Sequence, residues 1–214
     1  MLVLALNTAS AALEAALVRD GDILADARED MARGQDRQLP GFVERLLAEA
    51  GVTLQDVDRI AVVTGPGSFT GIRIGVAYAR GLALVTGAPC IGVTSLEAAI
   101  PAGMEGNTLG ALQAQKRPPD QTWWVQGLEG DEGISTPVEV SLDALKAMLE
   151  GFLVPIFMDG AEALGRLADG LDIRPMRPSA ITAALKAPAF DAGSHPPAPV
   201  YAREPDATLP GQKS

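Results

Sequence analysis

The stretch with the greatest chemical potential covers residues 64–75 and reads T-G-P-G-S-F-T-G-I-R-I-G. The apolar, β-branched run 60–63 before it predicts a buried strand, and a helix is expected to follow over residues 69–85. A glycine-rich turn between strand and helix can bind an anion, because free N–H groups and the helix dipole point at the same place. The glycines can equally serve only to make a tight corner, and the residue types leave both interpretations open.

Side chains that commonly carry catalysis are scarce elsewhere. The single histidine, His195, stands in a proline-rich tail, which excludes a Ser-His-Asp triad and a multi-histidine metal site in the folded lobes. Cys90 is the single cysteine, so no internal disulfide can form, and its apolar surroundings predict a buried, inert thiol in a reducing compartment. The run Gly71-Ile72-Arg73 lacks the lysine of a Walker motif.

Composition and charge narrow the class of protein further. The chain has 214 residues, of which 47% are hydrophobic and 21% charged, and these values are ordinary for a soluble globular protein. A formal net charge of −10 makes it a poor candidate for gripping phosphate backbones alone. Residues 1–6 are apolar but lack a basic n-region, so they predict a first strand, and the apolar run 74–85 is broken by Arg80. We therefore expect a cytoplasmic protein.

The elements that must position the glycine-rich turn follow from periodicity. Three strands are expected first, at 2–6, 12–19 and 23–29, with a hairpin turn at Asp20-Gly21-Asp22. A helix over 36–50 follows, with apolar residues at i, i+3, i+4 and i+7, and Pro40 places its start nearby. Strands at 59–64 and 89–93 flank the turn and its helix, and Thr94-Ser95-Leu96-Glu97 fits a capping box.

A flexible stretch at 103–107 predicts the boundary to a second lobe. Its expected strands are 108–114, 122–128, 138–140 and 155–158, and its expected helices are 141–149, 161–168 and 179–186. Trp123 and Trp124 are neighbours in a strand, so they face opposite sides and one is expected in the core. From Pro188 onward the chain is expected to be irregular, except around residues 200–203.

The helix after the glycine-rich turn carries small residues every fourth position, at Gly71, Gly75, Ala79 and Ala83. It is apolar almost all round, which indicates burial on more than one side. A strip of small side chains lets another backbone come close. Two interpretations remain: this is the central helix of a single domain, or one face awaits a second polypeptide.

Four blocks of sequence together carry a family resemblance. They are Leu4-Ala5-Leu6-Asn7-Thr8-Ala9, the run from Gly65 to Gly75, Gly92-Val93-Thr94-Ser95-Leu96-Glu97 and a tail block over 199–207. With these blocks the chain resembles the TsaB family of bacterial tRNA threonylcarbamoyladenosine biosynthesis proteins, densely over residues 1 to about 100 and sparsely beyond. The resemblance implies an α/β, actin-like ATPase (ASKHA) fold with two RNase H-like lobes, mixed sheets flanked by helices, and a reduced second lobe. We expect lobes at 1–103 and 104–190, and a tail, 191–214, that packs back on or near the first lobe.

The resemblance also implies a non-catalytic role. In this family the subunit pairs with a TsaD paralogue that carries the metal and nucleotide site, and a TsaE ATPase joins them. Together they transfer threonylcarbamoyl to the adenosine beside the tRNA anticodon. We therefore expect no cofactor on this chain, ATP and metal on the partner subunits, only indirect contact with tRNA, no membrane, and a homodimer when the partner is absent.

Three departures from the family pattern remove chemistry. Asn7 stands where an aspartate is usual, Gln35 where many relatives keep a histidine, and Gln113-Ala114-Gln115 where a D-A-R/K-like strand end is usual. They favour a scaffold over an autonomous enzyme, the alternative being a nucleotide-binding phosphotransferase or a peptidase.

Two sets of residues follow from this interpretation. The two long helices are expected to form the partner interface, with Leu39, Phe42, Arg45, Leu46, Phe69, Gly71, Ile72, Arg73, Gly75, Tyr78, Ala79 and Leu82. A vestigial nucleotide loop is expected at Asn7, Thr8, Gly65, Gly67 and Ser68.

Overall fold

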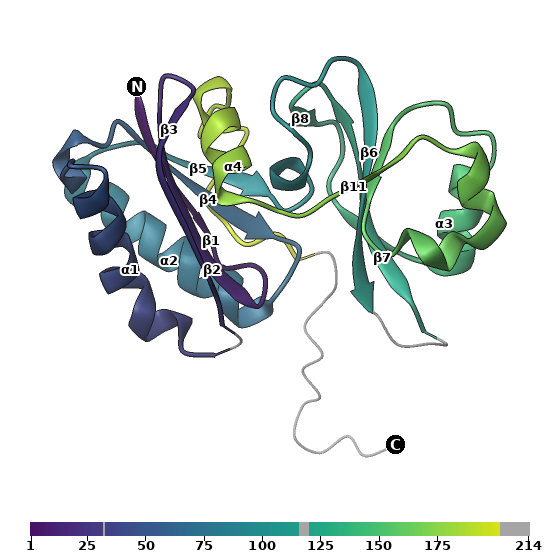
Figure 1. Cartoon of the computed structure of the whole chain (residues 1–214), viewed down its shortest axis with the longest axis horizontal. Helices are drawn as coiled ribbons and strands as arrows, with labels where there is room; N and C mark the ends of the chain where they lie inside the picture. Colours follow the sequence, from purple (N-terminus) through teal and green to yellow (C-terminus); the bar gives the residue numbers. More distant parts are fainter. Residues whose placement is uncertain (32, 116–119, 202–214) are drawn as a thin grey trace.

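Two lobes, each built on a mixed β-sheet flanked by helices, stand side by side in the computed structural model (Figure 1). The structure describes residues 1–31, 33–115 and 120–201. Among these residues, no helix combines the length and apolarity that a bilayer crossing requires.

The first sheet has the strand order β3-β2-β1-β4-β5. Its strands are β1 Leu2–Asn7, β2 Ala12–Arg19, β3 Asp22–Asp30, β4 Arg59–Gly65 and β5 Cys90–Thr94. The first three are antiparallel neighbours, whereas β4 is parallel to β1, with Leu4 opposite both Leu17 and Ile60. Every residue of β1 is buried, because helices cover both faces of the sheet.

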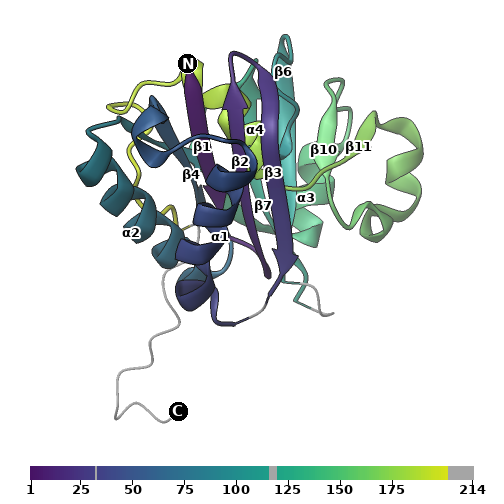
Figure 2. The same ribbon diagram turned by 60° about the vertical axis from the view of Figure 1, so that its left-hand side comes forward.

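Helices α1 Gln35–Glu49 and α2 Phe69–Thr86 cover one face of this sheet (Figures 1 and 2). Apolar side chains of α1 (Leu39, Phe42, Val43, Leu46 and Leu47) enter the core. Pro40 lies in the second turn of α1, not at its start, because the helix already begins at Gln35. Gly87, with φ 74°, ends α2 as a left-handed C-cap.

The second sheet has the order β11-β10-β6-β7-β8, with β9 paired to β7. Its elements are β6 Asn107–Gln115, β7 Thr122–Glu129, β8 Glu132–Gly133, β9 Val138–Ser141, α3 Leu142–Leu149, β10 Ile156–Met158 and β11 Ile173–Pro175. Trp123 is fully buried in the core of this lobe and Trp124 packs at the other face, which confirms the expected alternation. The helix expected at 161–168 is wrong in type, since Ala161–Gly170 is 3₁₀ and kinked at Gly165, where φ is 59°.

The last helix, α4 Ala180–Lys186, packs on the first sheet, although it lies within the range expected for the second lobe. Its alanines Ala183 and Ala184 are fully buried against that sheet, on the face opposite α1 and α2 (Figure 1). The chain then continues over residues 191–201, here called the C-terminal strap. His195 O accepts a hydrogen bond from Gly92 N at 2.8 Å, and Val200 N donates to Thr64 O at 2.8 Å. The strap therefore contacts the middle of β5 and the end of β4. Residues 202 and 203 of the expected ordered tail lie outside the described residues.

Candidate functional site

The glycine-rich turn is closed by hydrogen bonds within the chain. Ser68 is the N-cap of α2, and its Oγ accepts a hydrogen bond from Gly71 N at 3.2 Å. Ser68 N itself donates to Ala9 O at 2.7 Å, and Ile72 N donates to Ser68 O at 2.9 Å. Ser68 N and Gly71 N, two of the N–H groups at this turn, therefore have partners within the chain, and Ile72 N makes the first hydrogen bond of the helix. These contacts support the tight-corner interpretation of the turn.

At the glycines of the turn and of α2, the space that a side chain would need is occupied by other atoms of the same chain. A Cβ at Gly67 would collide with Ala9 O, and one at Gly71 would collide with Thr8 O. A Cβ at Gly75 would meet the Thr8 hydroxyl, which donates to Gly71 O at 2.7 Å. The small residues of α2 thus let the helix approach the loop between β1 and β2. Their close approach serves the chain's own packing, and this corrects the reason for which Gly71 and Gly75 were expected at a partner interface.

Asn7, at the end of β1, and Gln35, at the start of α1, hold structural positions. Asn7 Nδ2 donates to the buried carboxylate of Glu14 at 3.0 Å, and Asn7 Oδ1 accepts from Ala9 N at 3.1 Å. An aspartate at position 7 would place two carboxylates at this distance, so the amide is the compatible side chain here. Gln35 Nε2 donates to Ala12 O at 2.8 Å and to Ser10 O at 3.2 Å, which fixes the start of α1 to the β1–β2 loop.

The residues expected at the partner interface divide into two groups. Seven are buried within the chain's own fold: Leu39, Phe42, Leu46, Gly71, Ile72, Gly75 and Ala79. The others reach the surface: Arg45, Phe69 and Arg73 are exposed, and Tyr78 and Leu82 are half-buried. These two groups could not be separated from the sequence alone, because the small-residue strip has the same spacing whether it faces a sheet or a partner.

The outward face of α2 carries exposed apolar residues that were not expected at the interface. Leu84 is 88% exposed and Val85 is 68% exposed, and the small residues Ala77 and Gly81 are exposed on the same helix. Large apolar side chains exposed to this degree at the end of a long helix indicate a surface that another polypeptide can cover.

At the other end of α2, the C-terminal strap reaches the helix surface. Arg73 Nε donates to the Tyr201 hydroxyl at 2.9 Å, and the Arg73 guanidinium lies 3.7 Å from the centre of the Phe69 ring. The rings of Phe69 and Tyr201 are 5.2 Å apart. Two exposed aromatic rings thus hold one arginine in place, a composition typical of contact surfaces.

A buried charged cluster joins the strap to both lobes. The Glu97 carboxylate accepts hydrogen bonds from Thr94 N and from Gly133 N of the second lobe. Burial opposes its charge, but hydrogen bonds from His195, Thr94 and Gly133 outweigh this and lower the pKa of Glu97. The hydrogen bond to Glu97 raises the pKa of His195. Nearby, burial lowers the pKa of Lys186, whose Nζ is 3.5 Å from Asp131 Oδ1.

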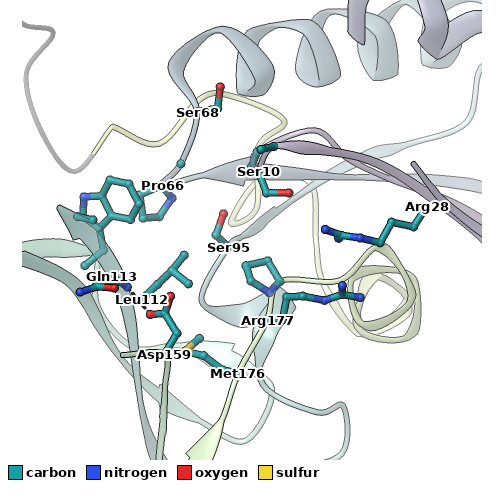
Figure 3. A pocket seen from close by; sticks show the side chains of 16 residues that line it. Ser10, Arg28, Pro66, Ser68, Ser95, Leu112, Gln113, Asp159, Met176 and Arg177 are labelled. Carbon is teal, nitrogen blue, oxygen red and sulfur yellow. Dashed lines mark hydrogen bonds between the residues drawn. The ribbon is translucent and has the colours of Figure 1, made fainter. Parts of the chain in front are cut away.

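A cavity of about 510 Å³ opens between the lobes (Figure 3). Its walls come from the β1–β2 loop, the glycine-rich turn, β6, β7 and the segment before α4. Within the described part of the chain, no group of three or more His, Cys, Asp and Glu side chains is arranged to hold a metal ion.

The chain matches known proteins in sequence. The family model described as TsaD, tRNA N6-adenosine threonylcarbamoyltransferase, matches residues 29–113. The chain is 34% identical over 143 residues to an uncharacterized protein of Mycobacterium tuberculosis, covering 66% of each chain. It is 34% identical over 138 residues to the tRNA threonylcarbamoyladenosine biosynthesis protein TsaB of Escherichia coli, covering 63% of this chain and 58% of that protein. A tRNA N6-adenosine threonylcarbamoyltransferase of Ruegeria is 47% identical over 68 residues, or 32% of this chain and 19% of the transferase.

Solved structures extend the similarity over almost the whole chain. YeaZ from Pseudomonas aeruginosa superposes with a TM-score of 0.67 at 25% identity, covering 94% of this chain and all of that one. An ROK hexokinase from Thermus thermophilus shares the fold alone, with a TM-score of 0.51 at 16% identity over 87% of this chain and 97% of the hexokinase. The two lobes therefore have the expected actin-like ATPase fold.

Proposed function

This chain belongs to the TsaB family, and we propose on that premise that it is the non-catalytic dimerisation and activating subunit of a tRNA threonylcarbamoyladenosine-forming complex. The complex would transfer threonylcarbamoyl to the adenosine beside the tRNA anticodon. The observation that carries the proposal is the exposed face of α2, where the side chains of Leu84 and Val85 are exposed to solvent beside the small residues Ala77 and Gly81. Covering such side chains contributes to association because it removes apolar surface from water.

The proposed partner is a TsaD-like paralogue. The TsaD family model matches residues 29–113, a range that includes α1 and α2 in full. Two paralogues that share these helices can pair the same faces across an approximate two-fold axis. The same geometry would allow a homodimer of this chain when the paralogue is absent.

We place ATP and metal on the partner subunits of the complex, with a TsaE-like ATPase as a third component. The hydrogen bonds that Ser68 N and Gly71 N make within this chain support the placement. A net charge of −10 supports indirect contact with tRNA, because backbone phosphates repel an acidic surface. The similarity to tRNA-modification proteins supports a cytoplasmic location for the proposed complex.

A substitution that introduces a charged residue at the exposed end of α2 tests the proposed interface. Leu84→Asp is expected to weaken association with the TsaD-like protein of the same organism by about tenfold or more, since it puts a carboxylate into an apolar contact. Leu153→Asp is the matched control, because Leu153 is 95% exposed and lies in the second lobe. Isothermal titration calorimetry measures affinity, and circular dichroism checks that both variants remain folded.

Equal affinity of Leu84→Asp and wild type would contradict the α2 interface. A Gly75→Leu variant is unsuitable for this test, because its side chain would strike Thr8 within the chain. Micromolar binding of ATP with magnesium, with turnover by the isolated chain, would contradict the non-catalytic role and favour an autonomous nucleotide-dependent enzyme.

A further inference from the structure

Buried polar atoms without partners gather around the cavity between the lobes. Five buried side-chain nitrogen or oxygen atoms have no hydrogen-bond partner within the described residues. Three of the five, Ser10 Oγ, Ser95 Oγ and Trp124 Nε1, belong to residues that line this one cavity. An unpaired buried donor costs about 1–3 kcal/mol, so three at one site call for a common explanation.

The three groups come from different parts of the fold. Ser10 lies in the β1–β2 loop, Ser95 follows β5 and is fully buried, and Trp124 belongs to β7 of the second lobe. Figure 3 shows Ser10 and Ser95 between Pro66 on one side and Arg28 and Arg177 on the other. The convergence of both lobes on one cavity is typical of a ligand site.

The chemistry of the lining favours an anion. The indole N–H of Trp124 can only donate, and both serine hydroxyls can donate. The charged residues that line the cavity are Arg28, Arg177 and Asp159. Arg28 forms ion pairs with Glu14 and Asp30, whereas the Arg177 side chain is 63% exposed and its Nη2 lies 3.9 Å from Glu14 Oε1. Arg177 therefore keeps donors for a further acceptor.

We propose that this cavity binds a small organic anion, whose carboxylate or phosphate group lies beside Arg177 and accepts hydrogen bonds from Ser10 and Ser95. Pro66, Leu112 and Met176 form an apolar wall for the carbon part of such a ligand. A volume of about 510 Å³ lies in the range of small-molecule pockets.

The anion group is proposed beside Arg177, away from the position that a nucleotide phosphate would take on the glycine-rich turn. Ser68 N and Gly71 N are already bonded to Ala9 O and Ser68 Oγ. The site is also independent of the proposed partner interface, because the exposed residues of α2 do not line the cavity.

The fluorescence of Trp124 can report binding of a ligand in the cavity. The chain has two tryptophans, and Trp123 is fully buried in the second-lobe core, so the variant Trp123→Phe leaves a single indole at the cavity. Fluorescence of this variant is titrated with inorganic phosphate, succinate and ADP, each up to about 10 mM, to cover weak binding. Saturable change with phosphate or succinate is expected. Stronger binding of phosphate than of succinate would indicate a ligand with a phosphate group, and stronger binding of succinate would indicate a carboxylate.

Two further substitutions assign the contacts. In the Trp123→Phe background, Arg177→Gln and Ser95→Ala are each expected to weaken binding about tenfold, through loss of a charge-assisted or a buried hydrogen bond. Arg166→Gln, at an exposed position outside the cavity, is the matched control and is expected to bind as before. Ser95→Ala removes an unpaired hydroxyl, so it should leave the unliganded chain at least as stable as its parent.

No saturable change with any of the three probes would overturn the proposal. Unchanged affinity in Arg177→Gln would overturn it as well, and this exposed position keeps the test valid if Ser95→Ala proves unstable. Binding of ADP alone, independent of Arg177, would point to a nucleotide site and count against the small anion.

Discussion

The Nε2 atom of His195 lies 3.5 Å from Oε1 of Glu97, a carboxylate whose side chain is 3% exposed. The imidazole also stacks on Phe190, with ring centres 3.9 Å apart. Because Gly133 of the second lobe donates to the same Glu97 oxygen, this contact ties the C-terminal strap to the junction of the two lobes. The charge on His195 therefore affects how firmly the strap is held.

His195→Phe is expected to lower the melting temperature in a pH-dependent way. The raised pKa of His195 gives stabilisation that is complete below the unfolded value of 6.5 and is lost as pH rises through the folded value. The lowered pKa of Glu97 gives stabilisation that is complete above 4.5 and is lost as pH falls through the folded value. The difference in melting temperature between wild type and His195→Phe should be largest at about pH 5–6, where both groups are charged in the folded chain.

Circular dichroism melts between about pH 4 and 9 check this expectation. The phenyl ring of the variant keeps the stacking on Phe190, so the comparison isolates the ion pair; His195→Ala reports ring and charge together. If the difference in melting temperature between wild type and His195→Phe is the same at every pH, the ion pair between His195 and Glu97 does not stabilise the folded chain.

Gly92→Ala is expected to loosen the strap. A Cβ at Gly92 would collide with Pro196 O, so either the strap or β5 must shift, at a cost of about 1–3 kcal/mol in unfolding free energy. Gly81→Ala is the matched control, because nothing lies within 4 Å of its Cβ position and α2 should gain up to about 1 kcal/mol. Urea denaturation measures both; equal stability of the two variants would contradict the packing of the strap on Gly92.

Asn7→Asp, which restores the residue usual in the family, is expected to destabilise this chain. The new carboxylate would stand at hydrogen-bond distance from Glu14, so one of the two must take up a proton. A raised pKa gives a destabilisation of about 1–3 kcal/mol at pH 7 that shrinks as pH falls and the pair becomes protonated. Asn7→Ser is the control without a charge. Urea denaturation at pH 7 and pH 5 tests the sign, and a larger loss at pH 5 would refute it.

The sequence predicted most elements because their signals are local. The period-2 strands, the hairpin at Asp20-Gly21 and the capping box at Thr94 and Glu97 all depend on residues close together in the chain, and each has its expected form. The placement of α4 could not be predicted in this way. The alanines of α4 can pack equally well on either sheet, so the sequence does not indicate which sheet the helix contacts. Long-range packing decides where this helix lies.

The site was harder to predict for the same reason. Spacing showed that Gly71, Gly75 and Ala79 share a face of α2, but not that Thr8 occupies the space in front of the two glycines. Exposure of Leu84 and Val85 becomes visible only when the opposite side of the helix is known. The sequence places His195 in a proline-rich tail, and only the folded chain brings Glu97 to it.

The C-terminal strap and α4 have a consequence for the order of synthesis. Both elements complete the lobe whose strands leave the ribosome first: α4 covers β1 and β2, and Val200 pairs with Thr64. Helices α1 and α2 cover one face of the first sheet, but its other face is covered only after the second lobe has been synthesised, and this final step closes a long loop. During translation its apolar strands stay open to chaperones, so a fragment of residues 1–103 should aggregate where the complete chain folds.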